Sequence, residues 1–313
     1  MTLKSVFFTF LSFQIWNLGL STYDCGPLSA CKCDTSDDFP MMMDCSDAGF
    51  TAVHLKNISN NVTWLDLSGN DFELFNLSDF EPMKNLTQLF IKRSHVKQID
   101  GSIFNAPPLN LLDLSDNSIS DLQHGQIVSQ TLHTLKLSNN LISTISQDAL
   151  KALLISPSLR TLDLSRNKIS SFPAIDSHEP SSLFLLNLSS NRLGEYLDDI
   201  HQSENFFYRL KSVQTMDLSS NEITELHHYL LADMTKMVNL NLSNNLIEDI
   251  GQISLSSDYH KHVTFNHFGQ DSPPLYWFPH GLFALQSIDL SMNKIKIPDI
   301  TIFSVENLPS MLL

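Results

Sequence analysis

The chain repeats one short motif at an almost fixed spacing, and this repetition restricts its fold more than any other feature. The motif reads L-x-x-L-x-L-x-x-N, for example over residues 109–117 and 159–167. A period of this kind predicts a solenoid, in which each coil packs only against its neighbours and the stack presents an extended binding surface. The last motif position is occupied by Asn70, Ser94, Asn117, Asn140, Asn167, Asn191, Asn221, Asn245 and Asn293.

The spacing between these positions locates the irregular units. The steps are 24, 23, 23, 27, 24, 30, 24 and 48 residues. Because the last step is twice 24, we expect a degenerate unit at about residues 255–284, with Val263 and Phe265 in its strand, which makes ten units. The two long steps contain residues 151–157 and 196–209, which we expect on the rim, either as interaction loops or as tolerated insertions.

Each unit is expected to contribute one short parallel strand. The two leucines of L-x-L point inward and the residue between them points outward, because side chains alternate along a strand. Ten strands at ~4.8 Å form a concave sheet roughly 45 Å long. The asparagine follows the strand, where its amide can both donate to and accept from the backbone of adjacent coils.

These residues resemble the leucine-rich repeat pattern, and the Leu-Asp-Leu-Ser strands are similar to its typical extracellular subclass. The resemblance implies an α/β repeat fold, a horseshoe with a parallel concave β-sheet and irregular or short helical segments outside. It implies no reaction. We assign residues 62–313 to the repeats.

Residues 1–21 are typical of a secretory signal, with Lys4 before an apolar stretch and small residues at the end. A membrane anchor is the weaker alternative, because Gln14 and Asn17 interrupt the run before it reaches ~20 apolar residues. The mature chain is therefore expected to be secreted or to lie on the extracellular face of the cell surface.

Four cysteines, Cys25, Cys31, Cys33 and Cys45, precede the first repeat and none follows. An oxidising compartment favours disulfides over a zinc site, although the spacing alone leaves three pairings open. Residues 22–61 resemble the N-terminal cap of extracellular leucine-rich repeat proteins. That resemblance implies bonds between Cys25 and Cys33 and between Cys31 and Cys45, in a cap that covers the first coil.

The outward strand positions define a candidate binding face. Without residues 1–21, 18 Lys and Arg oppose 34 Asp and Glu, a net charge of −16 that argues against nucleic acid as a partner. The carboxylates could form a face for basic ligands, or they could simply belong to the consensus strand. The candidate residues are Asp66, Phe90, Asp113, Lys136, Asp163, Asp217 and Asp289.

Six N-glycosylation sequons support the extracellular assignment. Asn187 and Asn241 occupy outward strand positions, so glycans there would screen the middle of the sheet and move a ligand toward either end or onto an edge. The alternative is that Leu-Asn-Leu-Ser forms a sequon by accident. The six sequons begin at Asn57, Asn61, Asn76, Asn85, Asn187 and Asn241.

The sequence contains no catalytic, phosphate-binding or dinucleotide motif, so we expect no enzyme activity, no cofactor and no metal. Histidines cluster in and beside the degenerate unit. They could respond to pH between 5 and 8, or they could be ordinary surface residues. The cluster comprises His260, His262, His267 and His280.

The resemblance extends to Toll-type receptor ectodomains and related adhesion proteins. It implies a non-catalytic recognition module, receptor-type or immune, for a protein or for a microbial or matrix ligand. The alternative is a cell-adhesion or extracellular-matrix structural protein that acts through homophilic contacts, as a homodimer, or through matrix contacts. One further period after Asn293 starts an eleventh strand at Leu312, and no C-terminal cap follows. We expect a fragment of a longer receptor, tethered to a membrane only if the chain continues beyond Leu313.

Overall fold

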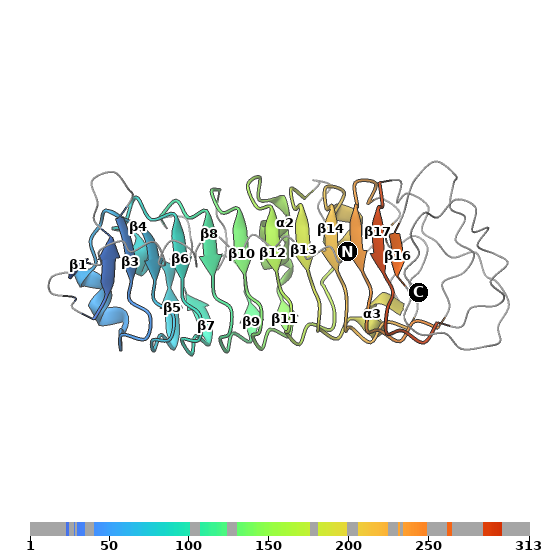
Figure 1. The fold of residues 1–313 in the computed structure, drawn as a ribbon, viewed down its shortest axis with the longest axis horizontal. Coiled ribbons are helices and arrows are strands. Elements are labelled where there is room, and N and C mark those ends of the chain that lie inside the picture. The colour runs from blue at the N-terminus through green and yellow to red at the C-terminus, as the bar shows by residue number, and fades with distance from the viewer. Residues whose placement is uncertain are drawn as a thin grey trace.

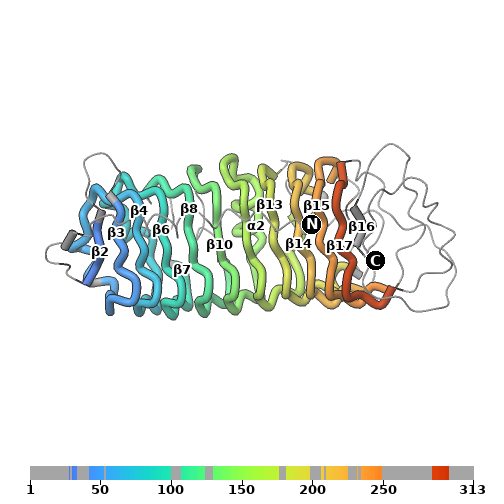
Figure 2. The backbone as a smooth tube through the Cα atoms, viewed as in Figure 1, coloured from blue at the N-terminus to red at the C-terminus, as the bar shows by residue number. Residues whose placement is uncertain are grey.

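The described residues form a stack of coils along one long axis (Figure 1). Successive coils repeat nearly the same path, as the backbone tube shows (Figure 2). The computed structural model describes residues 23–24, 28, 30–34, 41–100, 107–123, 130–175, 181–198, 206–224, 231, 234–248, 262–264 and 284–295. The expected signal segment, residues 1–21, and the expected strand at Leu312 lie outside these residues.

One sheet of 13 strands runs along the stack. The first two pairings, β1 with β2 and β2 with β3, are antiparallel, and the other pairings are parallel. In spatial order the strands are β1 (Tyr23–Asp24), β2 (Lys32–Asp34), β3 (Met41–Asp44), β4 (Val62–Asp66), β6 (Gln88–Phe90), β8 (Leu111–Asp113), β10 (Thr134–Lys136), β12 (Thr161–Asp163), β13 (Leu185–Asn187), β14 (Thr215–Asp217), β15 (Asn239–Asn241), β17 (Ser287–Asp289) and β16 (His262–Thr264). The expected leucine-rich repeat solenoid with its parallel sheet is confirmed.

Among the described residues, the opposite side of several coils carries shorter elements. Two small parallel sheets pair β5 (Leu74–Asn76) with β7 (Gln98–Asp100) and β9 (Asp121–Leu122) with β11 (Thr144–Ile145). Helical segments occupy the return path in several coils. They are η3 (Ala52–Asn57), η4 (Leu77–Phe80), α2 (Gln147–Ile155), α3 (Gly194–Asp198) and η7 (Phe206–Arg209).

The core is a column of inward leucines between these two sides. Leu112 and Leu114 of one motif are fully buried, and so are Leu162 and Leu164 two strands further along the sheet. Each such side chain stabilises the fold by about 1.5–3 kcal/mol, because its apolar surface leaves water. The inward alternation expected for L-x-L is therefore present in the structure.

A ladder of buried asparagine amides joins the coils. Asn167 Nδ2 donates to the carbonyl oxygens of Leu137 (2.9 Å) and Leu164 (3.0 Å), which belong to adjacent coils. Its Oδ1 accepts the backbone N–H of Ile142 (3.0 Å). One side chain thus satisfies three backbone groups that water cannot reach. The same arrangement recurs at Asn117, Asn140, Asn191, Asn221, Asn245 and Asn293.

Ser94 occupies one ladder position with a hydroxyl in place of an amide. Its hydroxyl donates to the carbonyl oxygens of Lys92 (2.9 Å) and Leu67 (3.4 Å). A hydroxyl is too short to take over the accepting role as well, and the N–H of Phe72 donates to the Ser94 carbonyl oxygen instead (2.9 Å).

The residue before each ladder position turns the chain in the left-handed backbone region. Arg166 has φ 52° and Met292 has φ 57°, although neither is glycine. Gly69 occupies the corresponding place in the first repeat with φ 72°. L-residues adopt this conformation at a cost of about 1–2 kcal/mol, so the ladder that follows must hold the turn in place.

The two long steps of the repeat are accommodated by packed helices. In the first, α2 begins after Ser146, whose side chain accepts the N–H of Ala149 (3.2 Å), and it buries Leu150 and Leu153. In the second, Phe206 and Phe207 of η7 are buried. The described parts of both insertions therefore contribute to the core.

The degenerate unit lies elsewhere than the period predicts. We expected its strand between those ending at Asn241 and starting at Ser287, but β15 pairs directly with β17, and β16 lies on the far side of β17. The ladder likewise passes from Asn245 straight to Asn293, whose Oδ1 accepts the N–H of Ile247 (3.1 Å). The degenerate unit has Phe268, which has no amide, at its ladder position. The unit that has kept its asparagine therefore continues the stack.

Replacing Asn167 with alanine should lower the free energy of unfolding by roughly 2–4 kcal/mol, because two carbonyl groups and one N–H lose their partner in the core. Ser94→Ala should lower it by about 1 kcal/mol, since that hydroxyl serves carbonyl oxygens only. Urea denaturation would measure both changes, and hydrogen exchange should locate the first near Ile142. Equal losses for the two variants would contradict the bridging role.

Candidate binding face

The sheet brings the expected outward residues into one straight column. Strand register places Asp66 beside Phe90, then Asp113, Lys136 and Asp163. The column continues through Asn187, Asp217, Asn241 and Asp289. We call this side of the main sheet the strand face. Each of the seven candidate face residues lies on it.

A turn at the end of each strand explains most of these carboxylates. The N–H of Ser165 donates to Asp163 Oδ1 (3.0 Å), and the N–H of Ser219 donates to Asp217 Oδ1 (2.9 Å). This is the local turn that Asp and Asn side chains form with a backbone N–H two residues on. Equivalent bonds connect Asp44 with Ser46, Asp66 with Ser68, Asp113 with Ser115, Asn187 with Ser189, Asn241 with Ser243 and Asp289 with Ser291.

Asparagine serves in this turn as well as aspartate. Asn187 Oδ1 accepts both the N–H (3.0 Å) and the hydroxyl (2.8 Å) of Ser189. An oxygen at this position therefore stabilises the turn whether or not it carries a negative charge. The charge remains available to attract a partner.

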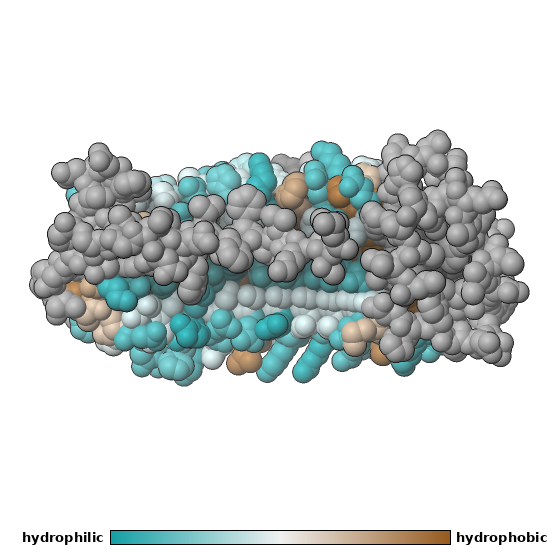
Figure 3. All heavy atoms as spheres, viewed as in Figure 1, coloured by the Kyte–Doolittle hydropathy of each residue, from teal (hydrophilic) through white to brown (hydrophobic). Residues whose placement is uncertain are grey.

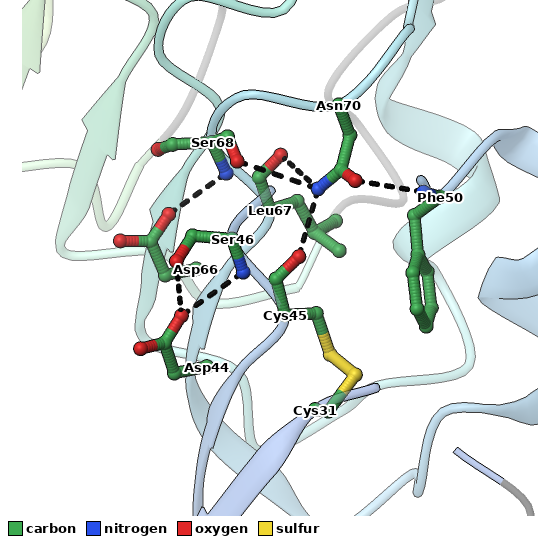
Figure 4. The surroundings of a disulfide bond; sticks show 9 residues. All are labelled: Cys31, Asp44, Cys45, Ser46, Phe50, Asp66, Leu67, Ser68 and Asn70. Carbon is green, nitrogen blue, oxygen red and sulfur yellow. Dashed lines mark hydrogen bonds between the residues drawn. A yellow bond between two sulfur atoms is a disulfide. The ribbon is translucent and has the colours of Figure 1, made fainter. Parts of the chain in front are cut away.

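The acidic end of the face lies beside the cap. Figure 4 shows the carboxylates of Asp44 and Asp66 on the opposite side of their strands from Phe50. Burial raises the pKa of Asp66 above its ordinary value, and the nearby Asp44 raises it further, while Ser68 and Lys92 lower it. Two lysines accompany these carboxylates, since Lys32 is in register with Asp44 and Lys92 lies near Asp66.

Lysines compensate part of the charge on neighbouring strands. Lys136 Nζ lies 3.8 Å from Asp113 Oδ2. Lys92 Nζ lies 5.9 Å from the centre of the Phe90 ring, a distance at which a cation is attracted to an aromatic face. Phe90 in turn packs against Trp64, with ring centres 5.3 Å apart.

The repeat motif predicts Phe90 as a face residue but does not predict its apolar neighbours on the face. Met42 pairs with Trp64 in register, and Leu111 lies on the strand after Phe90. An alignment of the units would have revealed them. At the outward position that Trp64 occupies, two residues before Asp66, other strands have threonine, namely Thr134, Thr161 and Thr215.

The cap contains one half of the expected disulfide pattern. Cys31 is bonded to Cys45, directly beneath the first ladder residue, and the carbonyl oxygen of Cys45 accepts from Asn70 Nδ2 at 2.8 Å (Figure 4). Cys33 is also disulfide-bonded. Cys25, its expected partner, lies outside the described residues.

The remaining candidate residues fall into two groups. Asn57, Asn61 and Asn85 are exposed, and Asn76 is half-buried. In the histidine cluster, His262 belongs to β16, but its side chain and the other three histidines lie outside the described residues. Among the side chains that are described, no three of His, Cys, Asp or Glu are placed to hold a metal ion. None of the described helices is long and apolar enough to cross a membrane.

Comparison with known proteins agrees with this architecture. The sequence model described as "Leucine rich repeat" matches residues 130–193 and 197–247. No curated protein matches the chain. One similar solved structure is a chain of the octameric complex of Latrophilin 3, Unc5D and FLRT2, in which FLRT2 is the component marked LRR. That chain is 20% identical with a TM-score of 0.62, and the match covers 90% of this chain and 82% of that one. The fold is that of a leucine-rich repeat solenoid.

Because the pKa of Asp66 is raised, the folded state holds its proton more tightly than the unfolded state does. Its contribution to stability is complete below the ordinary value of 3.8 and is lost as pH rises through the folded value. Asp66→Asn preserves the turn oxygen and removes the charge. We expect the variant to gain stability relative to the parent at pH 7, and this gain to shrink toward pH 3.

Urea denaturation at several pH values would measure this difference. Both proteins should come from a host without N-glycosylation, since an asparagine introduced two residues before Ser68 would create a sequon. A difference that stays constant from pH 7 to pH 3, or that grows as pH falls, would show that the charge of Asp66 is not disfavoured in the fold.

Proposed function

We propose that this chain is a non-catalytic recognition module of the extracellular space, of receptor type, that binds a protein through its strand face. The observation that carries the proposal is the unbroken alignment of outward side chains along the sheet, with most members half-exposed. Because neighbouring strands are ~4.8 Å apart and a strand rises ~3.3 Å per residue, the three-residue strands present a sheet surface of roughly 10 Å by 45 Å.

This size favours a protein as the ligand. The strands supply roughly 450 Å² of the ~800 Å² that each partner buries in a standard protein interface, and the turns that flank the sheet would supply the rest. On the side seen in Figure 3, the described side chains are mainly hydrophilic, and apolar areas are small and separate. The similar solved complex also contains, by its title, an LRR component together with two other proteins. These features support protein recognition, with immune ligands and matrix proteins as candidate partners.

The acidic face further favours a basic partner. The whole chain has a formal net charge of −15, and Asp163, Asp217 and Asp289 lie in one column of the face. Opposite charges accelerate association, because they steer the partners before contact.

The compartment follows from the cap and the sequons. A disulfide at Cys31 and Cys45 is stable in oxidising surroundings. The exposed side chains of Asn57, Asn61 and Asn85 are accessible to glycans. We therefore place the protein outside the cell, secreted or at the cell surface.

We expect a glycan at Asn187, in the middle of the strand face. A glycan attached to Nδ2 leaves Oδ1 free to accept from Ser189, so the turn is preserved. At Asn241 the attached sugar would compete with the bond from Nδ2 to Asp217 Oδ2 (3.0 Å), and we expect less modification in the folded, secreted material. Peptide mapping before and after glycosidase treatment would measure occupancy. An unmodified Asn187 would remove the screening of the central face.

Binding to a panel of recombinant extracellular protein domains tests the proposed function. The test variant replaces Asp163, Asp217 and Asp289 with serine, whose hydroxyl can still accept in the turn and which creates no sequon. For any domain that binds, the association rate constant should fall at least about threefold at low salt and less at high salt.

A matched control removes three negative charges away from the face, through Glu73→Gln, Glu81→Gln and Glu195→Gln. It should leave the association rate nearly unchanged. Equal effects of the two triple variants would contradict the strand face as the binding surface. Concentration-dependent dimers in light scattering, without any heterologous binder, would favour the adhesion alternative.

A further inference from the structure

We infer that the strand face carries a specific recognition site at its N-terminal end, built for an arginine next to an apolar side chain of a protein partner. The inference rests on the proposed function and gives it a location and a partner chemistry. The site consists of the apolar patch Met42, Trp64, Phe90 and Leu111 with the adjacent carboxylates of Asp44 and Asp66. We call it the aromatic patch.

The first argument is that Phe90 gives up a bond that most other strands make. An Asp or Asn oxygen at this position accepts a backbone N–H two residues on, as at Asp163 and Asn187. A phenyl ring cannot accept that bond, and the N–H of Lys92 donates to Ser68 Oγ instead (3.1 Å). Departures from a local structural rule concentrate at functional positions.

The second argument is the continuity of the apolar surface across four strands. Met42 is in register with Trp64, and the Trp64 and Phe90 rings pack 5.3 Å apart. Leu111 lies opposite Gln88 on the next strand, diagonal to Phe90. All four side chains are half-buried and so remain partly open to solvent. Half-exposed aromatic clusters of this kind are typical of the energetic centres of protein interfaces.

The third argument is charge. Asp44 and Asp66 are paired in register on the two strands that present Met42 and Trp64. Burial is the main cause that raises the pKa of Asp66, so its desolvated carboxylate would gain from a cationic partner that also hydrogen-bonds to it. Lys92 already lies near both Asp66 and Phe90, and Lys32 is in register with Asp44, so an incoming guanidinium would compete with two lysines for these carboxylates.

Arginine fits this combination better than lysine does. Its planar guanidinium can stack on an aromatic ring and can form two parallel hydrogen bonds with a carboxylate. Trp64 and Asp66 belong to the same strand and point to the same face, since they are two residues apart. An apolar residue next to that arginine would then lie on Phe90 and Leu111.

A variant that carries the consensus residues separates binding from folding. Trp64→Thr introduces the residue that β12 has at the equivalent strand position, Thr161. Phe90→Asn introduces the residue that β13 has at the equivalent position, Asn187. Phe90→Asn creates no sequon, because Lys92 stands two residues on, and the new amide oxygen can accept the turn N–H again. The double variant should therefore remain folded. The matched control is Leu185→Thr, which makes the same kind of change on β13, outside the aromatic patch.

The probe is a displayed library of random peptides, selected for binding to the intact secreted chain. We expect the selected peptides to be enriched in arginine next to an aromatic or aliphatic residue. Their affinity should fall at least tenfold with Trp64→Thr and Phe90→Asn together, and also with Asp44→Ser and Asp66→Ser together. It should change less than twofold with Leu185→Thr.

Three outcomes would overturn the inference: no selected peptides, peptides without arginine enrichment, or equal affinity for the parent and the double variant. None of these would decide the proposed function, which depends on the separate panel of protein domains and on the Asp163, Asp217 and Asp289 variant. Loss of panel binding only in that triple variant would place recognition on the face but away from the aromatic patch. Equal denaturation midpoints of the parent and the double variant would exclude misfolding as the cause of lost binding.

Discussion

The buried asparagine amide is the interaction on which the rest of this structure depends. Each coil leaves backbone carbonyl and N–H groups in the core, where an unpaired polar group costs about 1–3 kcal/mol. Only a side chain that both donates and accepts can satisfy the two kinds of group, and Asn167 does so for two successive coils. The amide therefore fixes the position of each coil against the next. Straight outward columns follow from that fixed position.

Those columns explain why the face is acidic before any ligand is considered. Asp163 and Asp217 each accept the N–H that ends their strand, and Asn241 does the same without charge. The turn thus favours an oxygen at this place and permits a negative charge. A ligand that is attracted electrostatically to the face would interact with charges whose positions are fixed by the turns. Phe90 is different, because its ring contributes nothing to the turn.

The sequence was sufficient to predict the architecture because the repeat encodes it locally. Inward leucines, ladder positions and the Cys31–Cys45 bond each follow from one motif or one resemblance, and the structure contains all of them. The position of the degenerate unit did not follow, because a regular period assumes that chain order equals stacking order. Asn293 has an amide and Phe268 has none, so the ladder selected the later unit. The aromatic patch was also hidden, because Met42 precedes the first full motif and becomes its neighbour only through strand register.

The direct step from Asn245 to Asn293 bears on how such a chain can change over evolutionary time. The ladder bond there spans 46 residues, against 25 between Ile142 and Asn167. Closing the longer loop costs only roughly 0.6 kcal/mol more, because loop entropy grows with the logarithm of length. Genetic insertions between two units can therefore accumulate at little thermodynamic penalty, provided that each end retains its asparagine. Inserted residues at such a junction can form new surface while the neighbouring coils keep their stability.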